Sequence, residues 1–278
     1  MTAVATMSHP GPKISIITVC FNSAKTIACT LQSVAEQTWP NIEHIVVDGA
    51  SSDGTLNVIE QNGSHVARLI SEPDKGIYDA MNKGIAAATG DVIGFINADD
   101  FYASPDVLKM VAAAFSHQDV NACYGDLCYV RQEDTSALVR YWKSSGFQAG
   151  AFERGWCPPH PTFFVRRTIY ERFGSFNLGF RIAADVELMM RFLEVHQIRA
   201  KYIPYMLVKM RMGGTTNRSW SNIVKQNVEV LRALKIYGLR SSFLPFAARK
   251  LICRGKQFLT RPSQGPVDYS LALRNLIR

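Results

Sequence analysis

The sequence lacks several features that would place it in common classes of protein. No apolar run approaches the roughly 20 residues needed to span a bilayer, so a transmembrane helix is not expected. The first 12 residues contain no apolar stretch of signal-peptide length, so export is not expected. The glycine motifs of P-loop proteins (G-x-x-x-x-G-K-[ST]) and of dinucleotide-binding folds (G-x-G-x-x-G) are both missing.

The chain also lacks the paired C-x-x-C spacing that holds zinc or forms redox disulfides. Reduced thiols, several of them buried, are therefore expected for its six cysteines in a cytoplasmic protein: Cys20, Cys29, Cys123, Cys128, Cys157 and Cys253. A hydrophobic content of 47% with 19% charged residues excludes general disorder. A length of 278 residues predicts one core with an appendage.

Positive charge is in excess and lies mostly at the C-terminus. The net charge is +8, and residues 240–278 contain eight Lys or Arg against one acid, Asp268. Residues 244–259 mix apolar and basic residues at helical spacing, which is typical of a helix lying on anionic lipid. Two alternatives remain for this segment: a helix packed on the main domain, or a nucleic-acid-binding tail.

Strand and helix patterns alternate along the first half of the chain, which predicts βαβ units and a mostly parallel sheet flanked by helices. Three segments are predicted: a leader at 1–12, an α/β domain at 13–215 and a basic helical extension at 216–278. The predicted strands are 14–19, 42–47, 66–70, 92–96, 122–130, 137–141 and one following 158–161. The predicted helices are 23–37, 55–61, 76–88, 183–195, 219–237 and 244–259.

Two adjacent acids end the buried strand at 92–96. The segment Asn97-Ala98-Asp99-Asp100 follows it directly, at the carboxyl edge of the sheet, where open α/β sheets bind ligands. Acids at that edge suggest a site for a divalent cation that binds a diphosphate. Because the ligands are oxygen atoms, Mg²⁺ or Mn²⁺ is favoured. The alternative is a solvated turn before a helix that begins near Ser104-Pro105-Asp106.

Other acids follow strands or begin helices. Asp48 ends the second strand beside the end of the first, where an acid can accept hydrogen bonds from a base N–H. Asp185 lies in the first turn of the predicted 183–195 helix. It is either a general base for a reacting hydroxyl or only a carboxylate that stabilises the helix dipole. His160 lies between prolines and is either structural or part of a site.

Taken together, these segments resemble the family 2 glycosyltransferases of GT-A (Rossmann-like) fold. The resemblance rests on SIITVCFN, DGASSDGT, EPDKGIYDAMNKGIAAATGDVIGFINADD, HPTFF and AADVELMMRF, over residues 13 to about 215. The region 72–86 is especially similar to bacterial exopolysaccharide enzymes of the colanic-acid type. The family resemblance implies inverting transfer of a sugar from a nucleotide-sugar donor, leaning to uridine, to an acceptor hydroxyl.

The resemblance also implies roles for individual residues. Asp185 matches the general base, Asp48 the base-reading acid, and Asp99 with Asp100 the metal site for Mn²⁺ or Mg²⁺. The expected donor-binding residues are Val19, Phe21, Asn22, Asp48, Ser51, Lys75, Gly76, Asn82, Asn97, Ala98, Asp99 and His160, with Gly84 in the same donor-side helix. Two positions depart from the family pattern: Asn97 replaces the first acid of Asp-x-Asp, and Ala184 replaces the Glu of the Glu-Asp pair.

The expected acceptor is a saccharide or lipid-linked saccharide, with the enzyme peripheral at the cytoplasmic face of the inner membrane and no nucleic-acid partner. Two other functions stay open at this stage. A nucleotidyltransferase would use the same sheet edge and metal, and usually carries a Gly-rich loop after the first strand, where this chain has Cys20-Phe21-Asn22-Ser23. A non-enzymatic nucleic-acid binder would use the basic tail, but no known reader motif is present.

Overall fold

The computed structural model describes residues 11–213, 220–240 and residue 255. Most of the basic extension, including nearly all of the predicted 244–259 helix, lies outside these residues. So do residues 1–10 of the predicted leader. Gly11 and Pro12 are held by the domain, because Asn41 Nδ2 and Trp39 Nε1 each donate a 3.1 Å hydrogen bond to their carbonyl oxygens.

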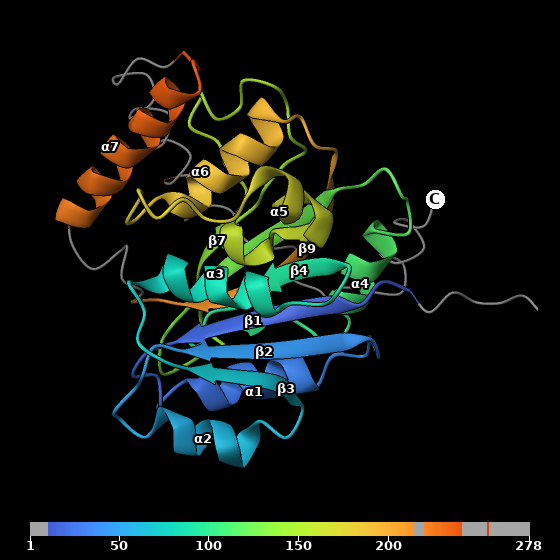
Figure 1. Cartoon of the computed structure of the whole chain (residues 1–278), viewed down its shortest axis with the longest axis vertical. Coiled ribbons are helices and arrows are strands. Elements are labelled where there is room, and N and C mark those ends of the chain that lie inside the picture. The colour runs from blue at the N-terminus through green and yellow to red at the C-terminus, as the bar shows by residue number, and fades with distance from the viewer. Residues whose placement is uncertain (1–10, 214–219, 241–254, 256–278) are drawn as a thin grey trace, which may run out of the picture.

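The first half of the chain forms the predicted parallel sheet with crossover helices (Figure 1). The strand order is β3-β2-β1-β4, and every pairing among these four is parallel. Their carboxyl ends therefore meet at one edge, where Cys20 pairs with Asp48. The elements are β1 (Ile14–Cys20), α1 (Ile27–Ala35), β2 (Ile42–Asp48), α2 (Thr55–Asn62), β3 (Val66–Ser71), α3 (Ile77–Ala87) and β4 (Val92–Phe95).

The second half extends the same sheet with antiparallel as well as parallel pairings. β8 pairs antiparallel with both β4 and β6, and β9 lies parallel to β6. In the described residues the sheet has nine strands in the order β3-β2-β1-β4-β8-β6-β9-β5, with β7 on β6. The strands are β5 (Phe101–Tyr102), β6 (Ala122–Val130), β7 (Leu138–Trp142), β8 (Phe164–Arg166) and β9 (Ala200–Arg211). The helices are α4 (Val107–Ala114), η1 (His160–Thr162), α5 (Arg167–Phe173), α6 (Ala184–Met190), η2 (Arg191–Val195) and α7 (Trp220–Ile236).

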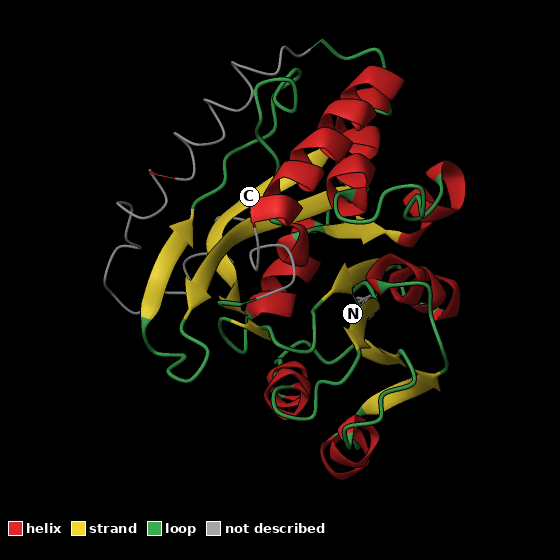
Figure 2. Ribbon diagram, turned by 90° about the vertical axis from the view of Figure 1, so that its left-hand side faces the viewer, coloured by secondary structure: helices red, strands yellow, loops and turns green. Residues whose placement is uncertain are grey.

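Helices cover both faces of the sheet, because alternate side chains of the buried strands point to opposite sides (Figure 2). Ile17 and Val47 pack in one core with residues of α3 and α6. Ile14 and Ile16 pack with α4, and Val46 packs with α1 and α2 on the same opposite face. The predicted α/β fold with a sheet flanked by helices is therefore confirmed.

Two predicted helices differ from the structure in their boundaries. The helix expected from Ser23 begins at Ile27, because the backbone N–H groups of Ser23 and Ala24 bond to side chains of the following loop, Thr55 and Asp53. The helix expected over 183–195 is α-helical to Met190 and continues as the π-helical turn η2. The first difference lies at the carboxyl edge of the sheet, where the loops after β1 and β2 meet.

A buried histidine on β2 predicts sensitivity of the fold to acid. His44 is 1% exposed, with Nε2 2.9 Å from Thr18 Oγ1 and Nδ1 3.0 Å from His65 Nε2. Burial, with the nearby charge of His65, lowers the pKa of His44 from 6.5 to about 3.

The unfolded chain therefore binds a proton that the folded chain excludes between these two pH values. We expect the contribution of His44 to be complete above pH 6.5 and lost toward pH 3, by up to about 1.4 kcal/mol of unfolding free energy per pH unit. Urea unfolding at several pH values, compared between wild type and His44→Gln, measures this slope. Equal slopes for the two proteins would contradict the prediction.

Candidate active site at the carboxyl edge of the sheet

The loops after β1 and β2 are tied together by side-chain hydrogen bonds. Asn22 N donates to Ser51 Oγ at 2.8 Å, and Ser52 N donates to Asn22 Oδ1 at 3.0 Å. Asn22 and Ala50 have positive φ angles of 49° and 61°, which non-glycine residues seldom adopt. Two expected donor-binding side chains, Asn22 and Ser51, thus hold the shape of this edge.

Asp48 is buried beneath these loops rather than open to a ligand. It is 0% exposed, and its carboxylate accepts hydrogen bonds from Ser51 N at 3.0 Å and Ser71 Oγ at 2.8 Å. Ser51 Oγ also donates to it at 2.5 Å. The geometry therefore gives Asp48 the role of fixing the turn after β2, which differs from the direct base contact expected from the resemblance.

Other expected donor-binding residues lie at the surface of this edge. Phe21 follows β1 with 64% of its surface exposed, which is unusual for an aromatic side chain at a strand end. Lys75 is exposed in the loop before α3, and Gly76 has a φ angle of +116°. Val19 and Ala98 are 6% and 4% exposed, so they can offer a ligand little beyond their backbone.

The segment after β4 carries unpartnered buried oxygens. Asn97 Oδ1 and Asp100 Oδ1 have no hydrogen-bond partner among the described residues, although Asn97 Nδ2 donates to Asp100 Oδ2 at 3.1 Å. Burial, and then the charge of Asp99, raises the pKa of Asp100 well above its ordinary value. Arg211 Nη1 donates to the Asp99 carbonyl at 2.7 Å and holds the segment from β9.

These oxygens fit a hard divalent cation, which takes carboxylate and amide oxygen ligands. The described residues contain no group of three or more His, Cys, Asp or Glu side chains placed to hold a metal. The protein alone would thus supply only part of the ligand set. Mg²⁺ typically binds through one or two carboxylates together with substrate phosphates, which matches an incomplete set of this kind.

Asp185 begins α6 and is held from the first turn of α3. Tyr78 OH lies 3.0 Å from Asp185 Oδ1 and 2.9 Å from the Ile182 carbonyl oxygen. Burial, and then the nearby Asp185 carboxylate, raises the pKa of Tyr78 well above 10, so its hydroxyl stays protonated as a donor. Because α3 follows the end of β3, this contact places Asp185 near the same edge of the sheet.

His160 lies in an aromatic cluster next to Asp185. It is 8% exposed and stacks on Phe95 of β4, with ring centroids 5.5 Å apart, while Phe176 meets it edge-on at 5.5 Å. Burial lowers the pKa of His160, and the charge of Asp185 partly offsets this effect. His160 therefore packs against Phe176, which in turn stacks on Tyr78, the partner of Asp185.

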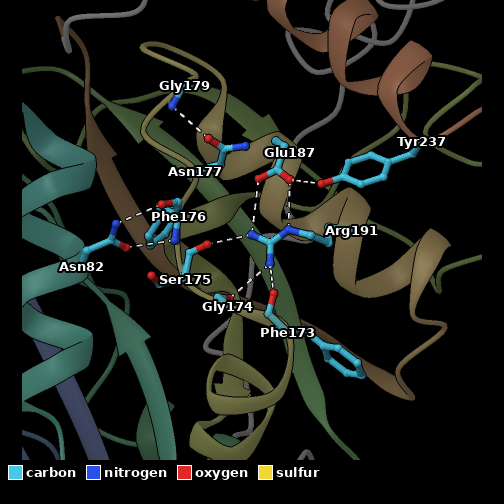
Figure 3. Close-up of polar contacts among 10 residues, drawn as sticks. All are labelled: Asn82, Phe173, Gly174, Ser175, Phe176, Asn177, Gly179, Glu187, Arg191 and Tyr237. Carbon is cyan, nitrogen blue, oxygen red and sulfur yellow. Dashed lines mark hydrogen bonds and ion pairs between the residues drawn. The ribbon is translucent and has the colours of Figure 1, made fainter.

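The loop before α6 is clamped between α3 and η2, the turn that continues α6 (Figure 3). Asn82 exchanges two 2.9 Å hydrogen bonds with the backbone of Phe176, one to its N–H and one to its carbonyl oxygen. From the other side, Arg191 donates to the carbonyl oxygens of Phe173, Gly174 and Ser175. Asn82, expected to bind the donor, is thus occupied in holding this loop. Gly84 allows α3 to approach β1, since a Cβ there would lie 2.4 Å from Ile17 Cγ2.

Helix α7 fixes the start of α6. The Glu229 carboxylate accepts hydrogen bonds of 2.9–3.0 Å from three successive backbone N–H groups, those of 181–183. Tyr237 OH donates to Glu187, whose carboxylate also pairs with Arg191 at 2.9 Å (Figure 3). The position of Asp185 therefore depends on a helix that comes later in the sequence.

The sequence did not single out Tyr78, Arg191 or Glu229. Tyr78 precedes an acid in GIYDAMN, and Arg191 is four residues after Glu187, a spacing that predicts an ion pair on one helix face. Glu229 has no local signal, because its partners are nearly 50 residues away in the sequence.

Comparison with known proteins identifies the family. The family model "Glycosyl transferase family 2" matches residues 15–182. A "PGL/p-HBAD biosynthesis glycosyltransferase" of Mycobacterium bovis is 31% identical over 211 residues, covering 74% of this chain and 80% of that protein. A "Putative glycosyltransferase EpsE" of Bacillus subtilis is 26% identical over 252 residues, covering 88% of this chain and 90% of the relative.

Solved structures share the fold. Residues 1–349 of S. aureus TarS superpose with a TM-score of 0.64 at 17% identity, covering 95% of this chain and 78% of that one. A mannosyltransferase from Pyrobaculum calidifontis, "PcManGT", in complex with GDP-Man and Mn²⁺, gives a TM-score of 0.61 at 20% identity. The match covers 99% of this chain and 76% of that one. The chain belongs to glycosyl transferase family 2 and is a glycosyltransferase of GT-A fold.

Proposed function

We propose that this protein transfers a sugar from a nucleoside-diphosphate sugar, with a UDP-sugar favoured, to an acceptor hydroxyl with inversion at the anomeric carbon. The observation that carries the proposal is the pair of unpartnered buried oxygens, Asn97 Oδ1 and Asp100 Oδ1, flanking Asp99 at the carboxyl edge. Asp185 lies near the same edge, bonded to Tyr78. A cation site and a general base are the two parts that this reaction needs.

In the proposed reaction, Asp185 accepts the proton of the acceptor hydroxyl as that oxygen forms a bond to the anomeric carbon. The bond from this carbon to the diphosphate oxygen breaks on the opposite face, and its electron pair leaves with the nucleoside diphosphate. Tyr78 orients Asp185, and the Phe176 ring, which stacks on Tyr78 and meets His160 edge-on, holds Tyr78 in place and would help to keep water from the site. Exclusion of water strengthens each electrostatic interaction.

Asp99, with Asn97 and Asp100, would hold a divalent cation, Mn²⁺ or Mg²⁺, against the diphosphate. The cation supplies charge stabilisation to the leaving group. Lys75 is exposed before α3 and is a second source of positive charge. The Mn²⁺ named with GDP-Man in the Pyrobaculum calidifontis structure supports a divalent metal.

The proposed donor is a UDP-sugar and the proposed acceptor a saccharide. Structures of S. aureus TarS in complex with UDP and with UDP-GlcNAc share this fold, which supports a uridine donor. The proposed acceptor is a saccharide or lipid-linked saccharide in exopolysaccharide, capsule or lipopolysaccharide assembly. The support is the sequence of the GIYDAMNKG region, which resembles exopolysaccharide enzymes.

The test measures release of nucleoside diphosphate from a panel of UDP-, GDP- and CDP-sugars, with Mn²⁺ or with EDTA. We expect Mn²⁺-dependent turnover of one donor class by the wild type and loss of turnover in Asp99→Ala. Asp106→Ala is the control, because Asp106 lies before α4 and its side chain bonds Thr38. Turnover by Asp99→Ala equal to wild type would remove the metal role assigned to Asp99.

We also propose that the protein works at the cytoplasmic face of the membrane. The described residues contain no helix long and apolar enough to cross a bilayer. The support is the sequence of 244–259, which mixes apolar and basic residues. We expect the full chain to float with vesicles containing phosphatidylglycerol and to stay behind with neutral vesicles. Equal behaviour with both kinds of vesicle would exclude electrostatic membrane binding.

A further inference from the structure

We propose that Asp74, rather than Asp48, reads the nucleobase of the donor by accepting its ring N–H. The inference rests on the proposed function and names a specificity-determining residue for it. Asp48 cannot reach a base without losing its own hydrogen bonds, because it is 0% exposed and bonded to Ser51 and Ser71. A more exposed acceptor at this edge is better placed to contact a base.

Asp74 lies directly over the residue that follows Asp48. A Cβ built on Gly49 would be 2.5 Å from Asp74 Oδ2 and 3.4 Å from Phe21 Cδ2. The Asp74 carboxylate thus occupies the space that a side chain at position 49 would fill, beside the exposed Phe21 ring. Glycine at 49 is what permits this arrangement.

The carboxylate is oriented by its own loop. Gly76 N donates to Asp74 Oδ1 at 2.8 Å, and Gly76 takes a φ angle of +116° that favours glycine. Asp74 Oδ2 receives no hydrogen bond from the described residues, and the side chain is half-buried. One oxygen is therefore fixed and the other is available to a ligand.

The chemistry of these groups selects a base. A carboxylate only accepts hydrogen bonds, so it matches the N3–H of uracil or the N1–H of guanine and repels the N3 lone pair of cytosine. The Phe21 ring, which is 64% exposed, offers a face for base stacking. Uracil is the base to which we commit.

The test compares UDP with UDP methylated at N3, which lacks the ring N–H, by calorimetry with Mn²⁺. We expect methylation to weaken binding to the wild type about 10-fold or more. Asp74→Ala is expected to bind UDP about as weakly as the wild type binds the methylated form, and to show no effect of methylation. Tighter binding of GDP than of UDP by the wild type would overturn the commitment to uracil.

A second variant leaves Asp74 in place. Gly49→Ala puts a methyl group against Asp74 Oδ2 and should weaken UDP binding as much as Asp74→Ala does. The variant that carries both substitutions should bind UDP no more weakly than either single variant. Glu72→Ala is the control, because Glu72 lies in the same loop and pairs with Lys83 at 2.8 Å. A full methylation effect in Asp74→Ala would overturn the inference while leaving the proposed function standing. Absence of any nucleotide binding by the wild type would overturn both.

Discussion

Replacing Asp185 with Asn is expected to lower the rate of sugar transfer by about 10²–10⁴-fold while leaving donor affinity unchanged. An asparagine cannot accept the acceptor proton, although it occupies the same space. Its amide oxygen can still accept the hydrogen bond from Tyr78, which lies 3.0 Å from Asp185 Oδ1 in the wild type. The loss should therefore appear in the chemical step alone.

Single-turnover release of nucleoside diphosphate measures that step, and calorimetry measures donor affinity. Tyr78→Phe keeps the base and removes only its orienting contact, so a smaller loss of rate is expected. Asp119→Asn is the control, because this exposed acid pairs with Arg199. A rate for Asp185→Asn close to wild type would show that Asp185 is not the base.

Replacing Glu187 with Ala is expected to destabilise the fold by about 3–5 kcal/mol. The Glu187 side chain is 0% exposed and pairs with Arg191, whose side chain is 11% exposed. Its removal leaves the Arg191 guanidinium buried without a counter-charge and breaks the hydrogen bond from Tyr237 that holds α7. Both losses fall on the segment that positions Asp185.

Urea unfolding followed by circular dichroism measures the change. Tyr237→Phe removes one hydrogen bond to the same carboxylate and should cost about 0.5–1.5 kcal/mol. Glu171→Ala is the matched control, because its i,i+4 pair with Arg167 is exposed on α5. A loss for Glu187→Ala no larger than for Glu171→Ala would show that the buried network does not stabilise α6 and α7.

The parallel half of the fold could be predicted from the sequence because its signals are local. β-branched runs alternate with helical spacing, which predicts parallel strands whose carboxyl ends share one edge. The antiparallel placement of β8 between β4 and β6 was not predictable in this way. Phe164–Arg166 is only three residues long and pairs with strands far away in the sequence.

The candidate site shows the same division. Asp99 and Asp185 could be proposed as site residues from the sequence, because an acid after a buried strand and an acid in the first turn of a helix are local signals. The sequence could not predict that Asp48 is buried or that Asn82 bonds the Phe176 backbone. Both features depend on packing between segments far apart in the chain. The family match decides among the functions that the sequence left open, in favour of a glycosyltransferase over a nucleotidyltransferase or a nucleic-acid binder.

We propose that Asp99 and the donor diphosphate hold a divalent cation together. Titration of Mn²⁺ followed by electron paramagnetic resonance tests it directly, because free Mn²⁺ gives a strong signal that binding broadens. We predict weak Mn²⁺ binding by the wild type alone, much tighter binding once UDP is present, and loss of that increase in Asp99→Ala. Equal Mn²⁺ binding by wild type and Asp99→Ala in the presence of UDP would contradict the claim.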